Sequence, residues 1–208
     1  MTEKEFSPKL VAGTVLLANI LWFATFYLEF STFWIKITVS ASILAALALW
    51  NSPMGKSRFR MDAGSLIMGL FSAIALYFIF WAGKEISFLM FPFAEQQIGN
   101  IYGKGDGTSK WMIFPLLLLV TGPCEEIFWR GFLQEKLTGR YGGLKGWIIA
   151  SLIYASVHIW SFNFMLIGAA AVAGAFWGAM YWRYRNLAPV IISHSLWSAF
   201  IFAVIPLT

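Results

Sequence analysis

The stretch TGPCEEIFWRGFLQ, residues 121–134, sets two adjacent glutamates and an arginine inside a run of apolar residues. The chain around it has 208 residues and is 59% hydrophobic and 18% aromatic, with 12% charged residues and a mean hydropathy of +0.70. These values lie outside the range of soluble domains and predict an integral membrane protein of the all-α class. Each ionisable side chain within a membrane helix costs at least about 2.5–3.5 kcal/mol, so three of them in one stretch indicate a function.

Apolar windows long enough to cross about 30 Å of hydrocarbon recur along the whole chain. They cover 10–28, 33–50, 63–82, 111–131, 147–161, 164–182 and 188–206. We therefore predict a polytopic helical bundle of about seven transmembrane helices, within a range of six to eight. The segment ISFLMFPFAEQQIG fits either an interfacial helix or an additional short span. We divide the chain into leading helices with a loop, 1–110, and a catalytic four-helix core, 111–208.

Positive charge is distributed unevenly between the loops. The net charge is +5, and most Lys and Arg residues fall in short connections, which indicates membrane topology rather than a nucleic-acid partner. Alternate connections carry Lys4, Lys9, Lys56, Arg58, Arg60, Lys136, Arg140, Lys145, Arg183 and Arg185. The others carry Lys84, Lys104 and Lys110, and Lys36 lies just inside the second window. Ten basic residues in the first set against four in the second predict a cytoplasmic N-terminus and, with seven spans, an external C-terminus. In a bacterium the membrane would be the inner one.

The ionisable residues of the fourth window are spaced so that two of them share a helix face. Glu126 and Arg130 are four residues apart and can pair along one face. Glu125 lies about 100° further round the helix and is left to face other helices. Gly122 and Pro123 precede the glutamates and are expected to kink the helix, which opens room for water.

The only two histidines, His158 and His194, lie in later apolar windows. Counted at about 1.5 Å per residue from the window ends, Glu125 and both histidines fall between the bilayer middle and its cytoplasmic side. They can therefore converge on one site. Ser198 follows His194 by four residues, so the two side chains can point in the same direction.

A plainer interpretation assigns these residues to helix packing. His158, His194 and Ser198 would then be interhelical hydrogen-bonding residues, and the Glu126–Arg130 pair would only fix helix register. The tract GAAAVAGAFWG, 168–178, predicts a close-packing face between helices, and we assign it no chemistry.

Three motifs resemble those of the CPBP family, the CAAX-processing and bacteriocin-processing intramembrane proteases. They are EEIFWRGFLQ at 125–134, YASVH at 154–158 and RNLAPVIISHSLWS at 185–198. The resemblance covers about 100 of the 208 residues and does not include the leading helices. It implies an intramembrane endopeptidase that cleaves near the membrane-bound end of a lipid-anchored or single-span substrate in the bilayer.

The resemblance also implies a role for each matched residue. Glu125 is implied as the general base that activates water, and His158 as the residue that holds this water. Glu126 and Arg130 are implied to support the site, and His194 to bind the oxyanion of the tetrahedral intermediate.

Two positions depart from the family pattern. Ser198 stands where asparagine or aspartate is usual, so a second oxyanion donor would be shorter. Tyr154 stands where phenylalanine is usual, which we regard as a minor change.

The sequence leaves three alternatives open. The family is often labelled as metalloproteases, and Glu125, His158 and His194 would give a zinc ion three ligands, although no His-x-x-x-His pair is present. We expect no cofactor and keep zinc as the alternative. Cys124, the only thiol, would allow a cysteine-assisted sorting-type peptidase or transpeptidase. A non-enzymatic membrane module or proton-coupled carrier would use the Glu–His cluster as a relay.

Overall fold

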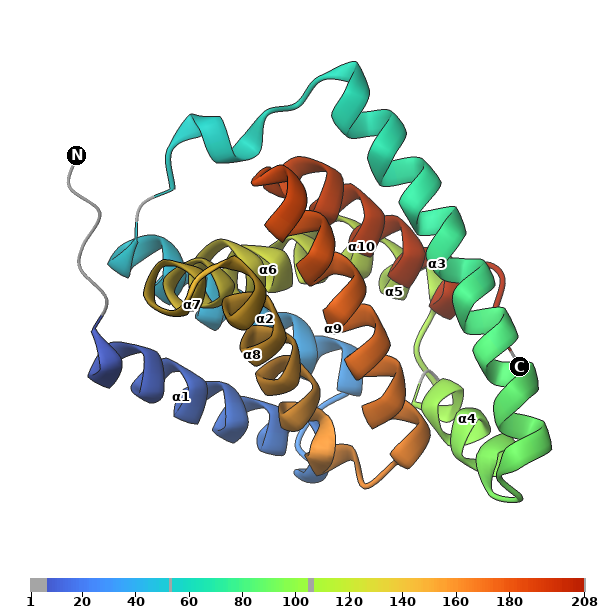
Figure 1. The fold of residues 1–208 in the computed structure, drawn as a ribbon. Coiled ribbons are helices and arrows are strands. Elements are labelled where there is room, and N and C mark those ends of the chain that lie inside the picture. Colours follow the sequence, from blue (N-terminus) through green and yellow to red (C-terminus); the bar gives the residue numbers. More distant parts are fainter. Residues whose placement is uncertain (1–6, 53, 105–106, 208) are drawn as a thin grey trace.

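The computed structural model describes residues 7–52, 54–104 and 107–207, and within these ranges every regular element is a helix (Figure 1). The α-helices are α1 (Pro8–Tyr27), α2 (Phe33–Asn51), α3 (Ala63–Met90), α4 (Ala94–Gly103), α5 (Lys110–Leu116), α6 (Gly122–Glu126), α7 (Glu135–Tyr141), α8 (Gly143–Ser156), α9 (Phe164–Tyr184) and α10 (Leu187–Ala203). The 3-10 segments are η1 (Lys56–Phe59) and η4 (Val157–Ser161), and the π-helical segments are η2 (Leu117–Thr121) and η3 (Ile127–Gln134).

Five helical runs are long and apolar enough to cross a membrane. They are Pro8–Tyr27, Phe33–Asn51, Ala63–Met90, Lys110–Tyr141 and Phe164–Tyr184, and α10 is a shorter apolar helix of 17 residues. The prediction of an all-α, multi-pass membrane protein is confirmed. Each of the seven apolar windows falls on a helix, and the number of helices that span the bilayer remains a prediction.

The helices begin at residues whose side chains satisfy free backbone N–H groups. Asp62 accepts the backbone N–H of Ser65 at 2.7 Å before α3, and Asn163 accepts that of Leu166 at 2.9 Å before α9. Asn186 does the same for Ala188 at 3.2 Å before α10. These caps fix the residues at which α9 and α10 start. They therefore also fix the depth within the bundle of the side chains on these two helices.

The segment after residue 83 does not form a separate long helix. Its first part continues α3 to Met90, and its second part is α4, whose ten residues span only about 15 Å. The side chain of Asn163 donates to the carbonyl of Gln97 at 2.7 Å, and the N–H of Met165 donates to the Gln97 side chain at 3.1 Å. These bonds attach α4 to the beginning of α9, as expected for an interfacial helix rather than a span.

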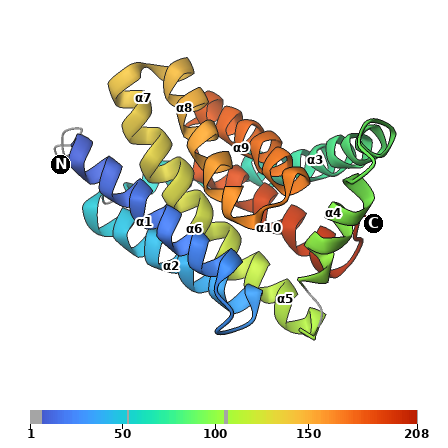
Figure 2. The same cartoon turned by 90° about the horizontal axis from the view of Figure 1, so that it is seen from below.

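Helix α10 lies inside the bundle, between α3 and the helix that carries the two glutamates (Figures 1 and 2). Helices α1 and α3 lie at opposite sides, and α1 and α2 run beside α6 in the view from below (Figure 2). Thr38 of α2 and Thr121 share a hydrogen bond of 2.8 Å, and Trp22 of α1 packs edge-on against Trp129 with ring centroids 5.6 Å apart. The leading helices therefore pack directly on the predicted core.

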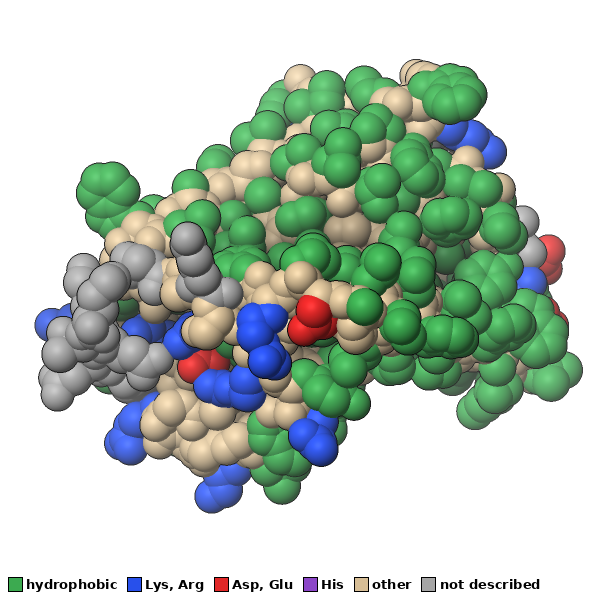
Figure 3. All heavy atoms as spheres, turned by 90° about the horizontal axis from the view of Figure 1, so that it is seen from above, with side chains coloured by type: hydrophobic (Ala, Val, Ile, Leu, Met, Phe, Trp, Pro, Cys, Tyr) green, Lys and Arg blue, Asp and Glu red, His purple; other side chains and the backbone are tan. Residues whose placement is uncertain are grey.

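The face seen in Figure 3 is mostly hydrophobic, and most of its basic side chains gather towards one end. Glu135 at the start of α7 pairs with Arg58 at 3.2 Å and with Arg185, so the connections before α3 and after α9 meet at one end of the bundle. We call it the basic end. Lys4, also predicted there, lies outside the described residues. Lys36 is buried at the opposite end, where its ammonium donates to the carbonyl of Leu28.

Candidate active site

The helix that carries the glutamates is irregular on both sides of them. The π-helical segments η2 and η3 directly precede and follow α6, which consists of Gly122–Glu126. Pro115 and Pro123 have no backbone N–H, so the regular hydrogen-bond ladder is interrupted before the site. Where a kink was predicted, the structure has wide π-helical turns, which are frequent at functional sites in membrane and soluble helices.

Glu126 is the centre of a buried charged network. Its Oε1 atom accepts hydrogen bonds from Arg130 Nη1 at 2.7 Å and from His194 Nδ1 at 2.6 Å. Glu126 is fully buried, and Arg130 is 2% exposed. The guanidinium also donates to the carbonyl of Gly174 at 3.2 Å and lies over the ring of Tyr154 at 4.7 Å. The predicted Glu126–Arg130 pair is present, and it extends to a third helix through His194.

Glu125 points away from this network, as its helical position predicts. Its Oε2 atom accepts a hydrogen bond from the hydroxyl of Tyr154 at 3.2 Å. The Glu125 residue is 7% exposed, and it lines a cavity that Glu126 and Arg130 do not line. The tyrosine that replaces the usual phenylalanine is therefore a direct partner of the proposed base, which makes this departure more than a minor change.

His158 lies in the η4 turn at the end of α8 and is held from two sides. Because a carbonyl oxygen only accepts, its Nδ1 atom donates to the carbonyl of Tyr154 at 2.9 Å. The other ring nitrogen, Nε2, then accepts the indole N–H of Trp22 at 3.4 Å. This pattern fixes the neutral form of the ring with a lone pair on Nε2. Trp22 belongs to α1, outside the motifs of the resemblance.

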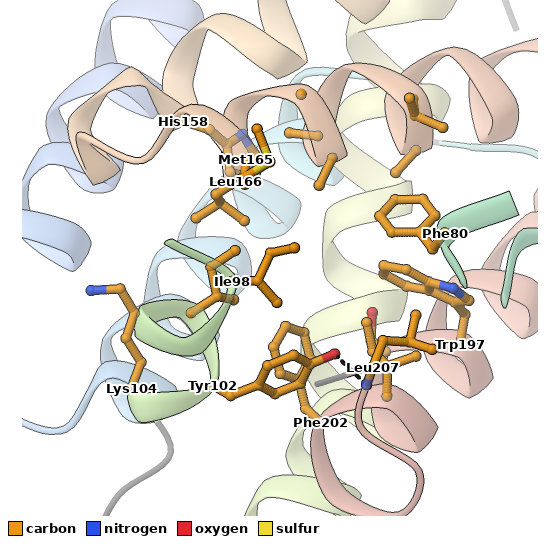
Figure 4. A pocket seen from close by; sticks show the side chains of 18 of the residues that line it. Phe80, Ile98, Tyr102, Lys104, His158, Met165, Leu166, Trp197, Phe202 and Leu207 are labelled. Atoms are coloured by element: carbon orange, nitrogen blue, oxygen red, sulfur yellow. Dashed lines mark hydrogen bonds between the residues drawn. The ribbon is translucent and has the colours of Figure 1, made fainter. Parts of the chain in front are cut away.

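One cavity of about 480 Å³ brings the predicted residues together. Glu125, His158, His194 and Ser198 all line it, together with mostly apolar side chains. Figure 4 shows His158 near one edge of the space, with Ile98 and Leu166 facing Phe80 and Trp197 across it. The volume lies within the usual range of ligand pockets.

A tryptophan in the small-residue tract contacts the site. The ring of Trp177 stacks on that of His194, with centroids 3.8 Å apart and an interplanar angle of 14°. Its indole N–H donates to Ser193 at 3.1 Å, which fixes its orientation. The tract 168–178 therefore does more than pack helices, because the Trp177 ring covers one face of the His194 imidazole and fixes its plane. The only sequence signal was a pair of large residues, Phe176 and Trp177, among small ones.

Two alternatives involve residues that the structure places differently. The thiol of Cys124 lies 3.9 Å from the Ser42 hydroxyl of α2, and Cys124 is not among the residues that line the cavity. Within the described ranges, no three His, Cys, Asp or Glu side chains are grouped as metal ligands. The donor set of the zinc alternative is thus not assembled, and we derive no step through a metal.

Gly122 allows α6 and α10 to pack closely against each other next to the candidate site. A Cβ atom at this position would lie 2.5 Å from Ser195 Oγ and 2.9 Å from Ser195 Cα. We predict that Gly122→Ala forces the two helices apart and destabilises the protein by about 1–3 kcal/mol. Activity should also fall, because the Glu126–His194 contact crosses the same interface.

The measurement for Gly122→Ala is thermal unfolding in detergent together with peptidase activity. Gly13→Ala is the matched control, because a Cβ atom there meets nothing within 4 Å. An unchanged melting temperature and activity in Gly122→Ala would mean that the close approach is not needed.

The helices, the buried Glu126–Arg130–His194 network and the cavity define a multi-pass membrane protein with an ionisable site inside its bundle. Residues 107–200 match the family described as Type II CAAX prenyl endopeptidase Rce1-like, so this segment is a domain of a protease family. The resemblance seen in the three motifs is thereby confirmed. No curated protein and no solved structure matches the chain. The matched segment contains every candidate site residue and leaves out α1–α4.

Proposed function

We propose that the chain is an intramembrane endopeptidase in which Glu125 activates a water molecule for attack on a peptide bond. One observation carries the proposal: the Glu125 carboxyl group is buried and yet lines a cavity that also holds His158, His194 and Ser198. Among the described residues the Glu125 carboxyl group has no ion-pair partner. Such a buried group is unfavourable in a membrane bundle, so its retention supports a chemical role. The substrate class is a polypeptide anchored in the bilayer by a lipid or a single span.

Glu125 would act first as base and then as acid. The carboxylate takes a proton from water as the oxygen attacks the carbonyl carbon, and a tetrahedral intermediate forms. The same proton then passes to the leaving nitrogen as the C–N bond breaks. The hydroxyl of Tyr154 donates to Oε2, which orients the carboxylate and leaves Oε1 for the water.

His194 is suited to stabilise the oxyanion. Its Nδ1 atom is engaged by Glu126, so only Nε2 can face the substrate. Because Nδ1 donates its hydrogen to Glu126, Nε2 can donate a second hydrogen bond only when both nitrogens of the His194 ring are protonated. The carboxylate of Glu126 balances the charge of such an imidazolium, and the stacked Trp177 ring adds a favourable cation–π contact. Glu126 and Arg130 therefore act as positioning residues.

His158 is suited to accept, not to donate. Its lone pair on Nε2 faces the Trp22 indole at 3.4 Å, a long contact that a water molecule can replace or share. In the proposed role, this nitrogen accepts one hydrogen of the attacking water while Glu125 takes the other.

Ser198 is the candidate for a second oxyanion donor. It lies four residues after His194 on α10, and both line the cavity. We predict that Ser198→Ala lowers kcat by about tenfold, less than the 10²–10³-fold typical of a well-placed donor, because the serine side chain is short. Ser198→Asn, which supplies the residue usual in the family, should match or exceed wild-type kcat.

Steady-state kinetics on one cleavable peptide measures both serine variants. Equal kcat in Ser198→Ala and wild type would remove Ser198 from the site. A loss in Ser198→Asn as large as in Ser198→Ala would mean that the position needs a small side chain rather than a donor.

The experiment that tests the function is a cleavage assay in detergent on a panel of lipid-anchored and single-span peptides. Products identified by mass spectrometry from wild type, and their absence with Glu125→Gln, would support the proposal. Cys124→Ala should cleave like wild type because its thiol faces α2, and loss of cleavage would revive the cysteine alternative. Proton flux in vesicles without any cleavage would favour the carrier.

A further inference from the structure

The cavity is closed towards the basic end of the bundle. Directly beyond the cavity-lining residues Glu125 and His194 lie Glu126, Arg130 and Gln134, each at most 2% exposed. The side chain of Gln134 donates to the carbonyl of Gly178 at 2.8 Å, and that of Arg130 to the carbonyl of Gly174. These bonds join η3 to α9 across the layer. Among the described residues, this buried layer therefore lies between Glu125 and the basic end.

The cavity extends instead towards the opposite end. Its lining includes Lys84 and Ser87 near the end of α3, Lys104 just after α4, and Phe33 at the start of α2. By contrast, none of the Lys and Arg residues of the basic end lines it within the described ranges. We call this the far end. The N–H of Leu207 donates to the Tyr102 hydroxyl there at 2.9 Å, which ties the C-terminal residues to α4 (Figure 4).

The cavity also reaches the lipid-facing side of the bundle between α3 and α9. Ile79 of α3 is 44% exposed and Val172 of α9 is 45% exposed, and both line the cavity. Phe164, at the first position of α9, lines it as well and is 55% exposed. An apolar rim suits a substrate that arrives laterally from the bilayer, and its position places this access in the far half of the protein.

Charge indicates which side of the membrane the far end faces. Lys and Arg in short loops are enriched on the cytoplasmic side, and nine described residues of the predicted basic connections are Lys9, Lys56, Arg58, Arg60, Lys136, Arg140, Lys145, Arg183 and Arg185. The far end has Lys36, Lys84, Lys104 and Lys110 together with Glu29, Glu85 and Glu95. The basic end is then cytoplasmic, and the cavity opens away from it.

From the sealed basic end and the open far end, we propose that this chain takes its substrate from the extracytoplasmic half of the membrane. This inference rests on the proposed peptidase function and narrows its substrate class. The substrates are exported polypeptides that remain anchored in the bilayer, with the scissile bond in or near the outer leaflet. A bond presented in the cytoplasm would be separated from Glu125 by the buried layer of Glu126, Arg130 and Gln134.

A labelling experiment tests the orientation without relying on activity. In a Cys124→Ala background, Ser87→Cys places one thiol at the far end, and Ser57→Cys is the matched control at the basic end. A membrane-impermeant maleimide added to intact cells should label Ser87→Cys at least tenfold more than Ser57→Cys. Both should be labelled after permeabilisation. The reverse pattern in intact cells would overturn the proposal.

A second experiment tests the side of cleavage. Two single-span substrates carry the same cleavable sequence, one at the outer membrane boundary and the other at the inner boundary. Wild type should cleave the outer substrate at least tenfold faster, and Glu125→Gln should cleave neither. Faster cleavage of the inner substrate would overturn the extracytoplasmic access and leave the peptidase function standing. Cleavage of neither, with no product in the detergent panel, would overturn the peptidase function itself.

Discussion

Replacing Glu125 with glutamine is expected to lower kcat by about 10²–10⁴-fold, the usual contribution of a positioned general base. An amide has nearly the shape of the carboxyl group and can still accept the Tyr154 hydroxyl through its oxygen. It cannot take a proton from water at neutral pH. The loss should therefore appear in kcat with little change in KM, because substrate binding depends on the apolar walls of the cavity.

Tyr154→Phe is the matched control for this result. It removes the 3.2 Å hydrogen bond to Glu125 and supplies the residue usual in the family, while the carboxylate stays in place. Its kcat should fall by about tenfold and by no more than about 10²-fold, because a single hydrogen bond to a charged group contributes about 1.5–3 kcal/mol and each 1.4 kcal/mol is a factor of ten in rate. Substantial turnover by a correctly folded Glu125→Gln protein would show that another group is the base.

Sequence periodicity predicted the helices and the contacts within one helix. All seven apolar windows lie on helices because a membrane segment satisfies its own backbone only in that form. The contact between Glu126 and Arg130 followed from their spacing of four residues and is present at 2.7 Å. The outward direction of Glu125 followed from the same geometry. These features depend on one helix alone, so no knowledge of packing was needed.

Contacts between helices could not be read from the sequence. His194 pairs with Glu126 at 2.6 Å, and nothing in the spacing indicated which glutamate it would meet. Trp22 and Trp177 contact the two histidines from α1 and α9, and no polar pattern marks either residue. Packing between helices also determines the length of α3 and the π-helical turns. The same holds for the part of the cavity that α3 and α4 line. The predicted division at residue 110 stays a prediction, and the cavity has walls from both parts of the chain.

Replacing Arg130 with methionine is expected to produce the largest loss of stability in the chain, about 3–5 kcal/mol. Arg130 is 2% exposed, and its guanidinium provides one of the two hydrogen bonds that Glu126 Oε1 accepts. Methionine fills part of the volume but leaves a fully buried carboxylate that, among the described residues, keeps only the hydrogen bond from His194. The bond to the Gly174 carbonyl and the contact with the Tyr154 ring are lost as well. Thermal unfolding in detergent measures the loss, and peptidase activity should fall with it.

The double variant Glu126→Gln with Arg130→Met separates the structural role of this network from its chemical role. Removing the buried charge together with its partner should recover at least half of the stability lost in Arg130→Met, since a buried pair is often neutral relative to uncharged residues. Activity should stay low, because His194 then lacks the carboxylate that balances an imidazolium and orients its Nε2 atom. Recovery of both properties would mean that Glu126 and Arg130 only hold the fold. Recovery of neither would mean that the charged pair itself is needed for helix packing.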